Sequence, residues 1–336
     1  MRSIKVNAQS FSYDVFIGKG LLDRCGEFIA LRRRVMIVTD SGVPEEYAQR
    51  VADKCNEYRI FRFKDGEGSK SLDTCQRLLL EMMDFNMSRR DLVVAVGGGV
   101  VGDLAGLCAS LYMRGIDFCN IPTTLLSQLD SSIGGKTAVN LGGVKNIVGA
   151  FYPPKCVLID PDVLKTLTPD MLSCGMAEAI KMAATSDAEL FEFLEEHSLS
   201  ELDGIIEDVV YRSLLIKKNV VEKDERESGL RQILNFGHTL GHGIEALGGV
   251  SHGQAVAYGC LVMTSDGERG RLANVFSSYG LSVKYEGDVD KALELTVHDK
   301  KASGDYVNVI KVDKIGNGRI EATSSKDFCA TVKERI

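Results

Sequence analysis

Residues 91–103 read DLVVAVGGGVVGD, an apolar run that ends in three glycines and leads into a helical pattern over residues 104–111. A strand, a glycine turn and a helix in this order are typical of a parallel α/β unit. Short β-branched runs of the same kind lie at residues 34–39, 118–121 and 156–159, with helical segments between them. We therefore predict an α/β fold for this half of the chain, with a parallel sheet covered by helices on both faces.

The second half of the chain has a different pattern. Long amphipathic stretches, such as residues 187–197 and 205–223, carry apolar residues at helical spacing. Thr168 can cap a helix that Pro169 opens at its first position, which makes a natural boundary. A chain of 336 residues is long enough for two domains. We expect a Rossmann-like domain at residues 1–167 and a mostly helical domain at residues 168–336.

The composition argues against nucleic-acid-binding, membrane and secreted proteins. The 40 basic and 47 acidic residues are interspersed and give a net charge of −7, so no basic stripe is available for a nucleic acid. No apolar run approaches the roughly 18 residues of a membrane span, and residues 1–9 lack the apolar core of a signal peptide. The nine cysteines are scattered and form no CxxC pair, which is typical of reduced thiols. We expect a cytoplasmic enzyme.

The glycine turn at residues 97–102 also satisfies the pattern GxGxxG. Backbone N–H groups at the start of the following helix can bind a pyrophosphate, whereas the same glycines would equally allow a helix to pack closely on a strand. Asp40 follows the apolar run at residues 35–39, where its carboxylate could accept hydrogen bonds from ribose hydroxyls or cap the next helix. The residues alone do not decide between phosphate binding and close packing for the glycines, or between ribose binding and capping for Asp40.

A second polar, glycine-rich segment follows Thr123 and Thr124. It reads DSSIGGKT at residues 130–137, and Lys145 and Asn146 come soon after another glycine pair. Hydroxyls and lysines grouped on a glycine-rich loop suit a hydroxylated or phosphorylated ligand. The segment is not a P-loop, because the earlier glycine and the strand of that motif are missing. A single lysine would more often be a solvated surface residue. The prediction of a ligand site therefore depends on the lysines being grouped with glycines.

Three of the five histidines, His238, His242 and His252, lie close together in the sequence. His238 and His242 are four residues apart and share one face if the segment is helical, and the glycines before His252 can turn the chain back toward that face. Glu178 is a candidate further ligand, because a carboxylate in an apolar helix needs compensation. The pattern favours a catalytic metal site over a hydrogen-bonded histidine cluster, but spacing does not decide which helix histidine is the ligand. A helix continuing back from His242 would also align Asn235 and Arg231.

Eight segments together resemble the 3-dehydroquinate synthase family, the shikimate-pathway members of the sugar phosphate cyclases. They are SYDVFIGKGLL (12–22), GGGVVGDLAG (97–106), YMRG (112–115), IPTTLLSQLDSSIGGKTAVN (121–140), KNIVGAFYPP (145–154), GMAEAIK (175–181), DERESGLRQILNFGHTLGHGIEA (224–246) and HGQAVAYG (252–259). The resemblance extends from residue 12 to about residue 301. It implies an amino-terminal Rossmann-like NAD domain and a helical, metal-binding carboxy-terminal domain, with the active site in the cleft between them.

The resemblance also assigns roles to residues. Metal ligands fall on Glu178, His238 and His252, with zinc or cobalt as the ion. NAD contacts fall on Asp40, Glu67, Lys70, Gly98, Gly99, Val100, Asp103, Thr123, Thr124, Asp130, Lys136 and Lys145. Substrate contacts fall on Arg114, Asp130, Lys136, Lys145, Asn146, Lys181, Lys217, Arg231, Asn235, His242 and Lys300. Within that set, catalytic roles fall on Lys136, Lys181, Asn235 and His242, and Arg114 is expected to reach the active site of the partner subunit in a homodimer.

The implied activity converts 3-deoxy-D-arabino-heptulosonate 7-phosphate into 3-dehydroquinate and phosphate. It combines transient oxidation at C5 by bound NAD, phosphate elimination, re-reduction and an intramolecular aldol closure. Arg231 suits a substrate carboxylate that the substrates of the related deoxyinosose and valiolone cyclases lack. Gln254 departs from the glutamate of many family members and follows the ligand His252 closely. The alternatives are another sugar phosphate cyclase, a metal-dependent polyol or glycerol dehydrogenase, and a nucleotide-sensing binding protein.

Overall fold

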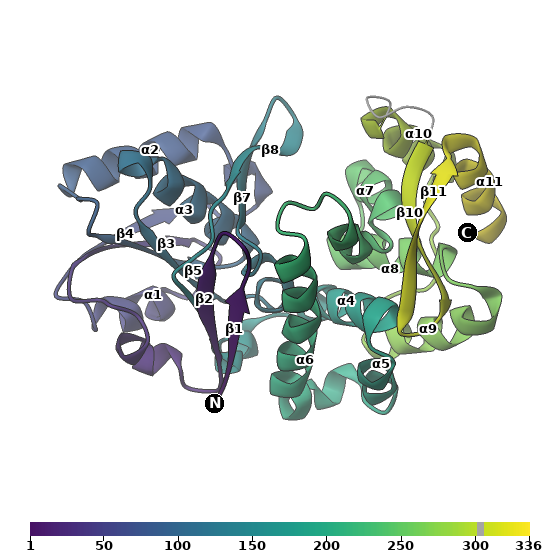
Figure 1. The fold of residues 1–336 in the computed structure, drawn as a ribbon, viewed down its shortest axis with the longest axis horizontal. Coiled ribbons are helices and arrows are strands. Elements are labelled where there is room, and N and C mark those ends of the chain that lie inside the picture. Colours follow the sequence, from purple (N-terminus) through teal and green to yellow (C-terminus); the bar gives the residue numbers. More distant parts are fainter. Residues whose placement is uncertain (301–305) are drawn as a thin grey trace. The chain divides into compact units, whose positions relative to one another are not determined.

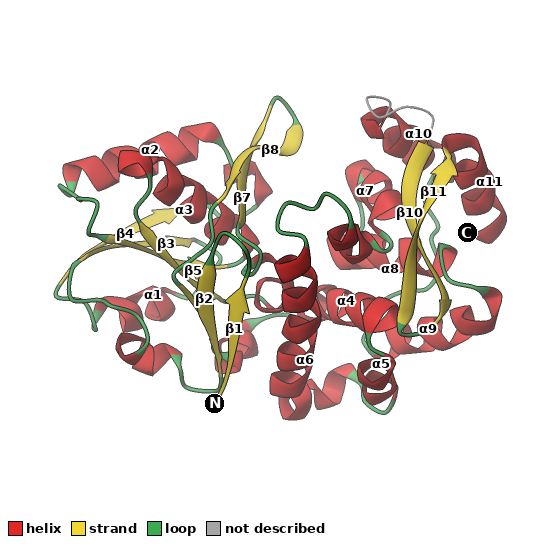
Figure 2. Cartoon of the chain, in the orientation of Figure 1, coloured by secondary structure: helices red, strands yellow, loops and turns green. Residues whose placement is uncertain are grey.

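The structure is a computed structural model that describes residues 1–300 and 306–336, with the backbone alone at residues 297–300. The chain forms two compact units, Met1–Leu167 and Thr168–Ile336. Figures 1 and 2 show a sheet covered by helices in the first unit and mostly helices in the second. The predicted fold class, a Rossmann-like region followed by a helical domain, is confirmed.

The first unit is built on a seven-stranded sheet with the order β1-β2-β9-β6-β5-β3-β4. β1 and β2 are antiparallel, and all the remaining neighbouring pairs are parallel. The four predicted strands are present as β3, β5, β6 and β9. The elements of this sheet and its helices are β1 (Arg2–Asn7), β2 (Ser12–Ile17), β3 (Arg34–Asp40), α1 (Glu45–Ala52), β4 (Glu57–Phe63), α2 (Leu72–Asp84), β5 (Leu92–Gly97), α3 (Gly99–Leu111), β6 (Asp117–Pro122) and β9 (Cys156–Ile159).

Alternate residues of the central strand β5 belong to two separate cores, as expected for a sheet covered on both faces. Leu92, Val94 and Val96 pack in a cluster that includes side chains of α1. Val93 and Ala95 point the other way, into a cluster with side chains of α2 and α3. Figure 1 shows α1 on one side of the sheet and α2 and α3 on the other. The glycine turn after β5 therefore lies at the end of a fully buried strand.

Strands β7 (Lys136–Leu141) and β8 (Val144–Phe151) form a separate antiparallel hairpin that the sequence prediction misses. Lys136 opens β7, and Lys145 and Asn146 lie on β8, so the expectation of a loop at these positions was wrong. Gly142 and Gly143 form the reversal, with φ of 60° and 82°, a backbone conformation that glycine adopts without strain. The glycine pair is therefore the turn of a hairpin.

The second unit is mostly helical, as predicted. Oγ1 of Thr168 accepts a hydrogen bond from the backbone N–H of Met171 at 3.3 Å and caps a helix that starts at Pro169. Among the described residues, none of the helices is both long and apolar enough to cross a membrane. The elements are α4 (Pro169–Ser186), α5 (Ala188–Glu195), α6 (Leu202–Lys223), α7 (His238–Leu247), α8 (His252–Val262), α9 (Asp266–Ser278), α10 (Val289–Lys300), the hairpin β10 (Tyr306–Lys314) and β11 (Asn317–Ser324), and α11 (Ser325–Arg335).

Candidate functional site

Glu178 lies in the middle of α4 and is 1% exposed. Among the described residues, neither carboxylate oxygen accepts a regular hydrogen bond. Lys181, one turn further along and equally buried, forms an ion pair with Oε2. Burial favours the neutral acid, but Lys181 and two nearby imidazoles outweigh it and hold the pKa of Glu178 well below its ordinary value. The helix thus presents an ionised, buried carboxylate whose Oε2 is paired with Lys181 and whose Oε1 faces two imidazoles.

The three clustered histidines meet beside this carboxylate. α7 begins at His238, and His242 lies on the same face with its ring centroid 5.2 Å from that of His238. Gly248 and Gly249, with φ of 78° and 86°, reverse the chain after α7. α8 then starts at His252, whose ring centroid lies 5.3 Å from that of His238. The turn therefore brings His252 back toward α7, as the sequence suggests.

The facing atoms have the spacing of a metal site. Nε2 of His238 lies 3.6 Å, and Nε2 of His252 lies 3.5 Å, from Oε1 of Glu178. Ligands about 2.1 Å from a tetrahedral ion lie about 3.4 Å from one another. The three residues each offer one ligand atom, all within 4.8 Å. They fit a divalent ion such as zinc or cobalt, and of the two histidines that spacing leaves open, His238 belongs to this set.

The two imidazoles differ in charge and share an orientation. Burial and the neighbouring ammonium lower the pKa of His238 to about 3, so this ring is neutral at pH 7. Burial also disfavours the charged form of His252, but Glu178 and Glu245 outweigh it and raise the pKa of His252 to about 9. Nδ1 of His238 lies 3.2 Å from the carbonyl oxygen of Phe236, and Nδ1 of His252 lies 3.0 Å from Oε2 of Glu245. Both rings therefore turn Nε2 toward Glu178.

Glycines allow α4, α7 and α8 to approach so closely. A Cβ on Gly259 of α8 would lie 2.0 Å from the carbonyl oxygen of Gly237, just before α7. A Cβ on Gly253, the second residue of α8, would lie 2.6 Å from Cα of Cys174, one turn before Glu178 on α4. Real Cβ atoms do not approach backbone atoms this closely, so only glycine fits. The spacing of the three candidate ligands depends on these contacts.

The segment before α7 is a separate helix and does not continue α7 toward its N-terminus. A helix continuing through Arg231, Asn235 and His242 would have aligned them, but residues 230–235 form a short 3₁₀ helix that ends before α7. Gly237, with φ of 77°, separates the two helices. With about three residues per turn, Arg231 and Asn235 do not share a face of the 3₁₀ helix. The left-handed glycine therefore breaks the predicted alignment.

The second unit buries three of the cations assigned to the substrate. Lys181, Lys217 and Arg231 are 2%, 4% and 3% exposed. The carboxylate of Asp224 accepts hydrogen bonds from three backbone N–H groups of the following loop, including that of Arg231 at 2.9 Å. Burial would raise the pKa of Asp224, but these bonds outweigh it and lower the pKa to about 2. The ionised Asp224 thus fixes the loop that carries Arg231, a role the sequence analysis misses.

The remaining predicted residues of this unit are placed as follows. Nδ2 of Asn235 donates a hydrogen bond to Oε1 of Glu227 at 2.8 Å. Glu227 has φ of 59°, a strained conformation for a glutamate, and no sequence signal singles it out. His242 is exposed, with its ring centroid 6.4 Å from that of His252. Lys300 ends α10, and its side chain lies outside the described residues.

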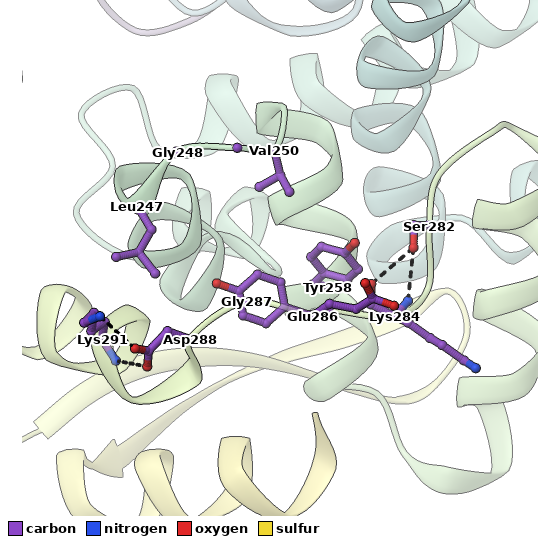
Figure 3. A pocket seen from close by; sticks show the side chains of 12 residues that line it. Leu247, Gly248, Val250, Tyr258, Ser282, Lys284, Glu286, Gly287, Asp288 and Lys291 are labelled. Atoms are coloured by element: carbon purple, nitrogen blue, oxygen red, sulfur yellow. Dashed lines mark hydrogen bonds and ion pairs between the residues drawn. The ribbon is translucent and has the colours of Figure 1, made fainter.

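Gln254 pairs with a loop of the same unit. Its side-chain amide donates to the carbonyl oxygen of Ser282 at 2.5 Å and accepts from the N–H of Ser282 at 2.8 Å. A carboxylate could not donate the first bond, so the glutamine fits this contact. Ser282 lines a pocket of about 590 Å³ together with Tyr258 and Tyr285, whose ring centroids lie 5.3 Å apart (Figure 3). Its lining includes none of the predicted site residues.

In the first unit, the glycine turn joins β5 to α3 as predicted. A Cβ on Gly98 would lie 3.1 Å from Cγ2 of Thr124, and a Cβ on Gly99 would lie 3.2 Å from Oγ of Ser131. Close packing therefore partly explains why Gly98 and Gly99 are glycines. Gly98, Gly99 and Val100 are nevertheless partly exposed, which leaves the N-terminus of α3 accessible to a phosphate.

Asp40 at the end of β3 caps a local turn. Its Oδ1 accepts hydrogen bonds from the N–H groups of Gly42 at 2.9 Å and Val43 at 3.2 Å. Burial outweighs these bonds and raises the pKa of Asp40 above its ordinary value. These bonds close the turn after β3 and do not cap α1, which starts at Glu45 after Pro44 without a side-chain cap, so ribose binding by Asp40 stays a prediction.

Four predicted residues form one polar network. Nζ of Lys70 lies 2.5 Å from Oδ2 of Asp103 and also donates to Oδ1 of Asn146. Asn140 donates to Oε1 of Glu67 at 2.8 Å and accepts from the N–H of Asn146 at 2.8 Å. Burial raises the pKa of Asp103, and Lys70 opposes that shift. The hairpin β7–β8 therefore joins residues before α2 to Asp103 of α3.

The other predicted residues of this unit are more widely distributed. Thr123 is buried, and its N–H donates to the carbonyl oxygen of Gly97 at 2.9 Å. Thr124 bonds through its hydroxyl to Oγ of Ser127 at 2.9 Å. Asp130 lies in a single turn of π-helix at residues 127–131 and is partly buried. The exposed members are Arg114, Lys136 and Lys145.

Comparison with protein families gives two matches. A family model described as 3-dehydroquinate synthase N-terminal matches residues 60–174, and one described as 3-dehydroquinate synthase C-terminal matches residues 175–302. The 3-dehydroquinate synthase of Clostridium kluyveri is 41% identical over 338 residues, which cover 94% of this chain and 94% of the relative. That of Streptococcus pneumoniae is 40% identical and covers 97% of this chain and 98% of its own length.

Solved structures show the same fold. A 2-deoxy-scyllo-inosose synthase complexed with carbaglucose-6-phosphate, NAD+ and Co2+ is 25% identical and covers 100% of both chains with a TM-score of 0.89. A 2-epi-5-epi-valiolone synthase from Streptomyces hygroscopicus with NAD+ and Zn2+ bound is 29% identical, covers 98% of this chain and 99% of its own, and has a TM-score of 0.87. A probable glycerol dehydrogenase from Sinorhizobium meliloti, 16% identical, covers 95% of each chain with a TM-score of 0.63 and shares the fold alone.

Proposed function

Because this chain belongs to the 3-dehydroquinate synthase family, we propose that it converts 3-deoxy-D-arabino-heptulosonate 7-phosphate into 3-dehydroquinate and phosphate, a step of the shikimate pathway. The observation that carries the proposal is the buried set of Glu178, His238 and His252, with Nε2 atoms 3.5 and 3.6 Å from one carboxylate oxygen. When bound, NAD supplies reversible hydride transfer at C5, and a divalent ion supplies Lewis-acid polarisation of a substrate hydroxyl. The enzyme is then a carbon–oxygen lyase.

The buried cations of the second unit fit an anionic substrate. Arg231 and Lys217 are almost fully buried, and Nη1 of Arg231 donates a hydrogen bond to the carbonyl oxygen of Glu225 at 2.7 Å, which holds the guanidinium in place. The guanidinium of Arg231 can bind a carboxylate through two parallel hydrogen bonds, which a lysine cannot do. Lys181 neutralises Glu178 and orients it. His242 lies beside the proposed ligands with an exposed ring, where it can move a proton to or from a substrate hydroxyl.

The first unit supplies the proposed NAD site. The partly exposed N-terminus of α3, at Gly98 and Gly99, is suited to the pyrophosphate. The polar network of Glu67, Lys70 and Asp103 offers charged groups from two further segments. The relatives with solved NAD complexes share this fold over their full length, which supports the placement.

A single assay tests the proposed reaction. With the heptulosonate phosphate, a divalent ion and NAD in catalytic amount, we expect one phosphate released for each substrate consumed. NADH absorbance should not persist, because the hydride taken from C5 is returned. Lasting accumulation of NADH without phosphate would contradict the lyase and favour a dehydrogenase. Metal-loaded protein that releases neither product would contradict any enzyme of this class.

We also propose that the protein works as a homodimer in which Arg114 acts on the substrate of the partner subunit. Exposed apolar clusters mark protein contacts. The hairpin β7–β8 leaves four large apolar side chains about half exposed, namely Leu141, Val144, Ile147 and Phe151. Met113 and the exposed Arg114 have φ of 49° and 69°, left-handed conformations that are strained in residues other than glycine and that support a functional role for this turn.

Mixing two inactive variants tests the exchange of Arg114. In a heterodimer of Arg114→Ala and Glu178→Gln subunits, one active site carries both changes and the other carries neither. Random mixing makes half of the dimers heterodimers, so phosphate release should recover to about a quarter of the wild-type rate. If Arg114 served its own subunit, every site would carry a change and no activity would return. A protein that sediments as a monomer would also contradict the proposal.

We propose the cytoplasm as the compartment of this enzyme. All nine cysteines are free thiols, which is typical of a reducing environment.

A further inference from the structure

The geometry of α7 and α8 points to Glu245 as the residue that positions His252 for metal binding. We infer that its carboxylate holds the Nδ1–H of His252, fixes the tautomer with a free Nε2, and sets the direction of that atom. Glu245 would act through His252 and not as a ligand itself. The inference rests on the metal centre of the proposed function and adds to it a determinant of metal affinity.

The contacts of the His252 ring carry the inference. Nδ1 lies 3.0 Å from Oε2 of Glu245, a hydrogen-bond distance, whereas Nε2 lies 3.5 Å from Oε1 of Glu178. The imidazole is therefore held between two carboxylates from different helices. His252 can bind a metal only as the neutral imidazole, which has one N–H donor and one acceptor nitrogen, so donation of Nδ1–H to Glu245 then makes Nε2 the ligand atom on the side of Glu178.

The position of Glu245 on α7 explains why it can reach this ring. It comes seven residues after His238, two helical turns, so both side chains lie on the same face of the helix. One helix therefore carries a proposed ligand at its start and the positioning group for a second ligand near its end. Gly248 and Gly249 turn the chain immediately afterwards, and α8 returns alongside α7.

The two histidines are held in different ways. Nδ1 of His238 faces a backbone carbonyl oxygen, that of Phe236, which lies in the turn before α7 and cannot be changed by substitution. Nδ1 of His252 faces a side chain and is therefore open to test. An anionic acceptor also makes the imidazole a stronger donor to a metal than a carbonyl oxygen does. Loss of the Glu245 carboxylate should thus weaken metal binding through His252 alone.

The experiment compares Co2+ binding by the full-length wild type and the variants Glu245→Ala and Glu245→Gln. We expect Glu245→Ala to raise the Kd for Co2+, measured by competition with a chelator, by about 10–100-fold. The d–d absorption of the bound Co2+ should also change, because the ring is no longer fixed. Glu245→Gln keeps an oxygen acceptor for Nδ1–H, so it should retain most of the wild-type spectrum and lose less affinity than the alanine variant.

Gln254→Ala is the matched control. Gln254 comes two positions after His252, and the change removes its two hydrogen bonds to Ser282, which lines the pocket in Figure 3, but leaves the histidine ring untouched. Its Kd and Co2+ spectrum should equal those of the wild type. Equal losses in Gln254→Ala and Glu245→Ala would overturn the inference, because they would indicate general loosening of α8. Circular dichroism confirms folding, and Glu245→Gln provides the comparison if the alanine variant unfolds.

The outcomes separate this inference from the proposed function. If Glu245→Ala binds Co2+ with the wild-type Kd and spectrum while the wild type releases phosphate, the positioning role is wrong and the function stands. If the wild type binds no divalent ion, the metal centre and the inference fail together. If the Kd and the spectrum change in the Glu245 variants but not in Gln254→Ala, both the metal centre and the positioning role are supported.

Discussion

Replacing Glu178 by glutamine is expected to abolish tight binding of a divalent ion and to lower kcat by about a thousandfold or more. The carboxylate is the one anionic member of the proposed ligand set, and both histidines direct Nε2 toward its Oε1. An amide keeps the shape but loses the charge that attracts the ion. A thousandfold loss corresponds to about 4 kcal/mol of transition-state stabilisation. The measurements are metal content after dialysis and the rate of phosphate release.

The same change should also destabilise the fold, because Lys181 would remain buried without its anionic partner. Breaking a buried pair typically costs about 3–5 kcal/mol in the free energy of unfolding. The double variant Glu178→Gln, Lys181→Met should recover much of this stability without regaining metal binding. A Glu178→Gln enzyme that retains tight metal binding and turns over within tenfold of the wild type would contradict the assignment of this ligand.

The second large effect is expected at Gly259. A Cβ at this position would lie 2.0 Å from the carbonyl oxygen of Gly237, and a backbone atom cannot move aside as a flexible side chain does. Gly259→Ala should therefore separate α7 from α8, lower the free energy of unfolding by about 3 kcal/mol or more, and weaken metal binding. Chemical denaturation and the Co2+ titration measure the two effects.

Gly270→Ala serves as the control for Gly259→Ala. Gly270 lies within α9, and a Cβ there would meet nothing within 4 Å. Alanine favours the helix over glycine by up to about 1 kcal/mol, so this variant should be as stable as the wild type or slightly more stable. If Gly259→Ala were no less stable than Gly270→Ala, close packing of α7 on α8 would not explain the glycine.

Local sequence patterns were sufficient to predict the central sheet and the start of the helical unit. The apolar run at residues 92–97 is buried on both faces, so its signal does not depend on distant residues. Thr168 and Pro169 mark a helix start through their own backbone and side-chain chemistry. The clustering of His238 and His252 was also visible, because histidine is rare in this chain.

Features that depend on contacts between distant segments could not be predicted in the same way. The spacing of Arg231 and Asn235 suggested one helix, but Gly237, which packs closely against α8, adopts a left-handed conformation that ends it. His242 lies outside the proposed ligand set because of where α4 places Glu178. The spacing of residues along α7 carries no information about that position. The hairpin β7–β8 was missed because β8, VKNIVGAF, does not alternate apolar and polar residues, although Gly142 and Gly143 carry a turn signal.

X-ray absorption spectroscopy of the Co2+-loaded protein tests the central claim most directly. The account predicts one Co2+ per chain with two imidazole nitrogens and carboxylate oxygen among its ligands, and removal of the ion should stop phosphate release. A spectrum showing sulfur ligation or fewer than two imidazoles, or full phosphate release after the ion is removed, would contradict it.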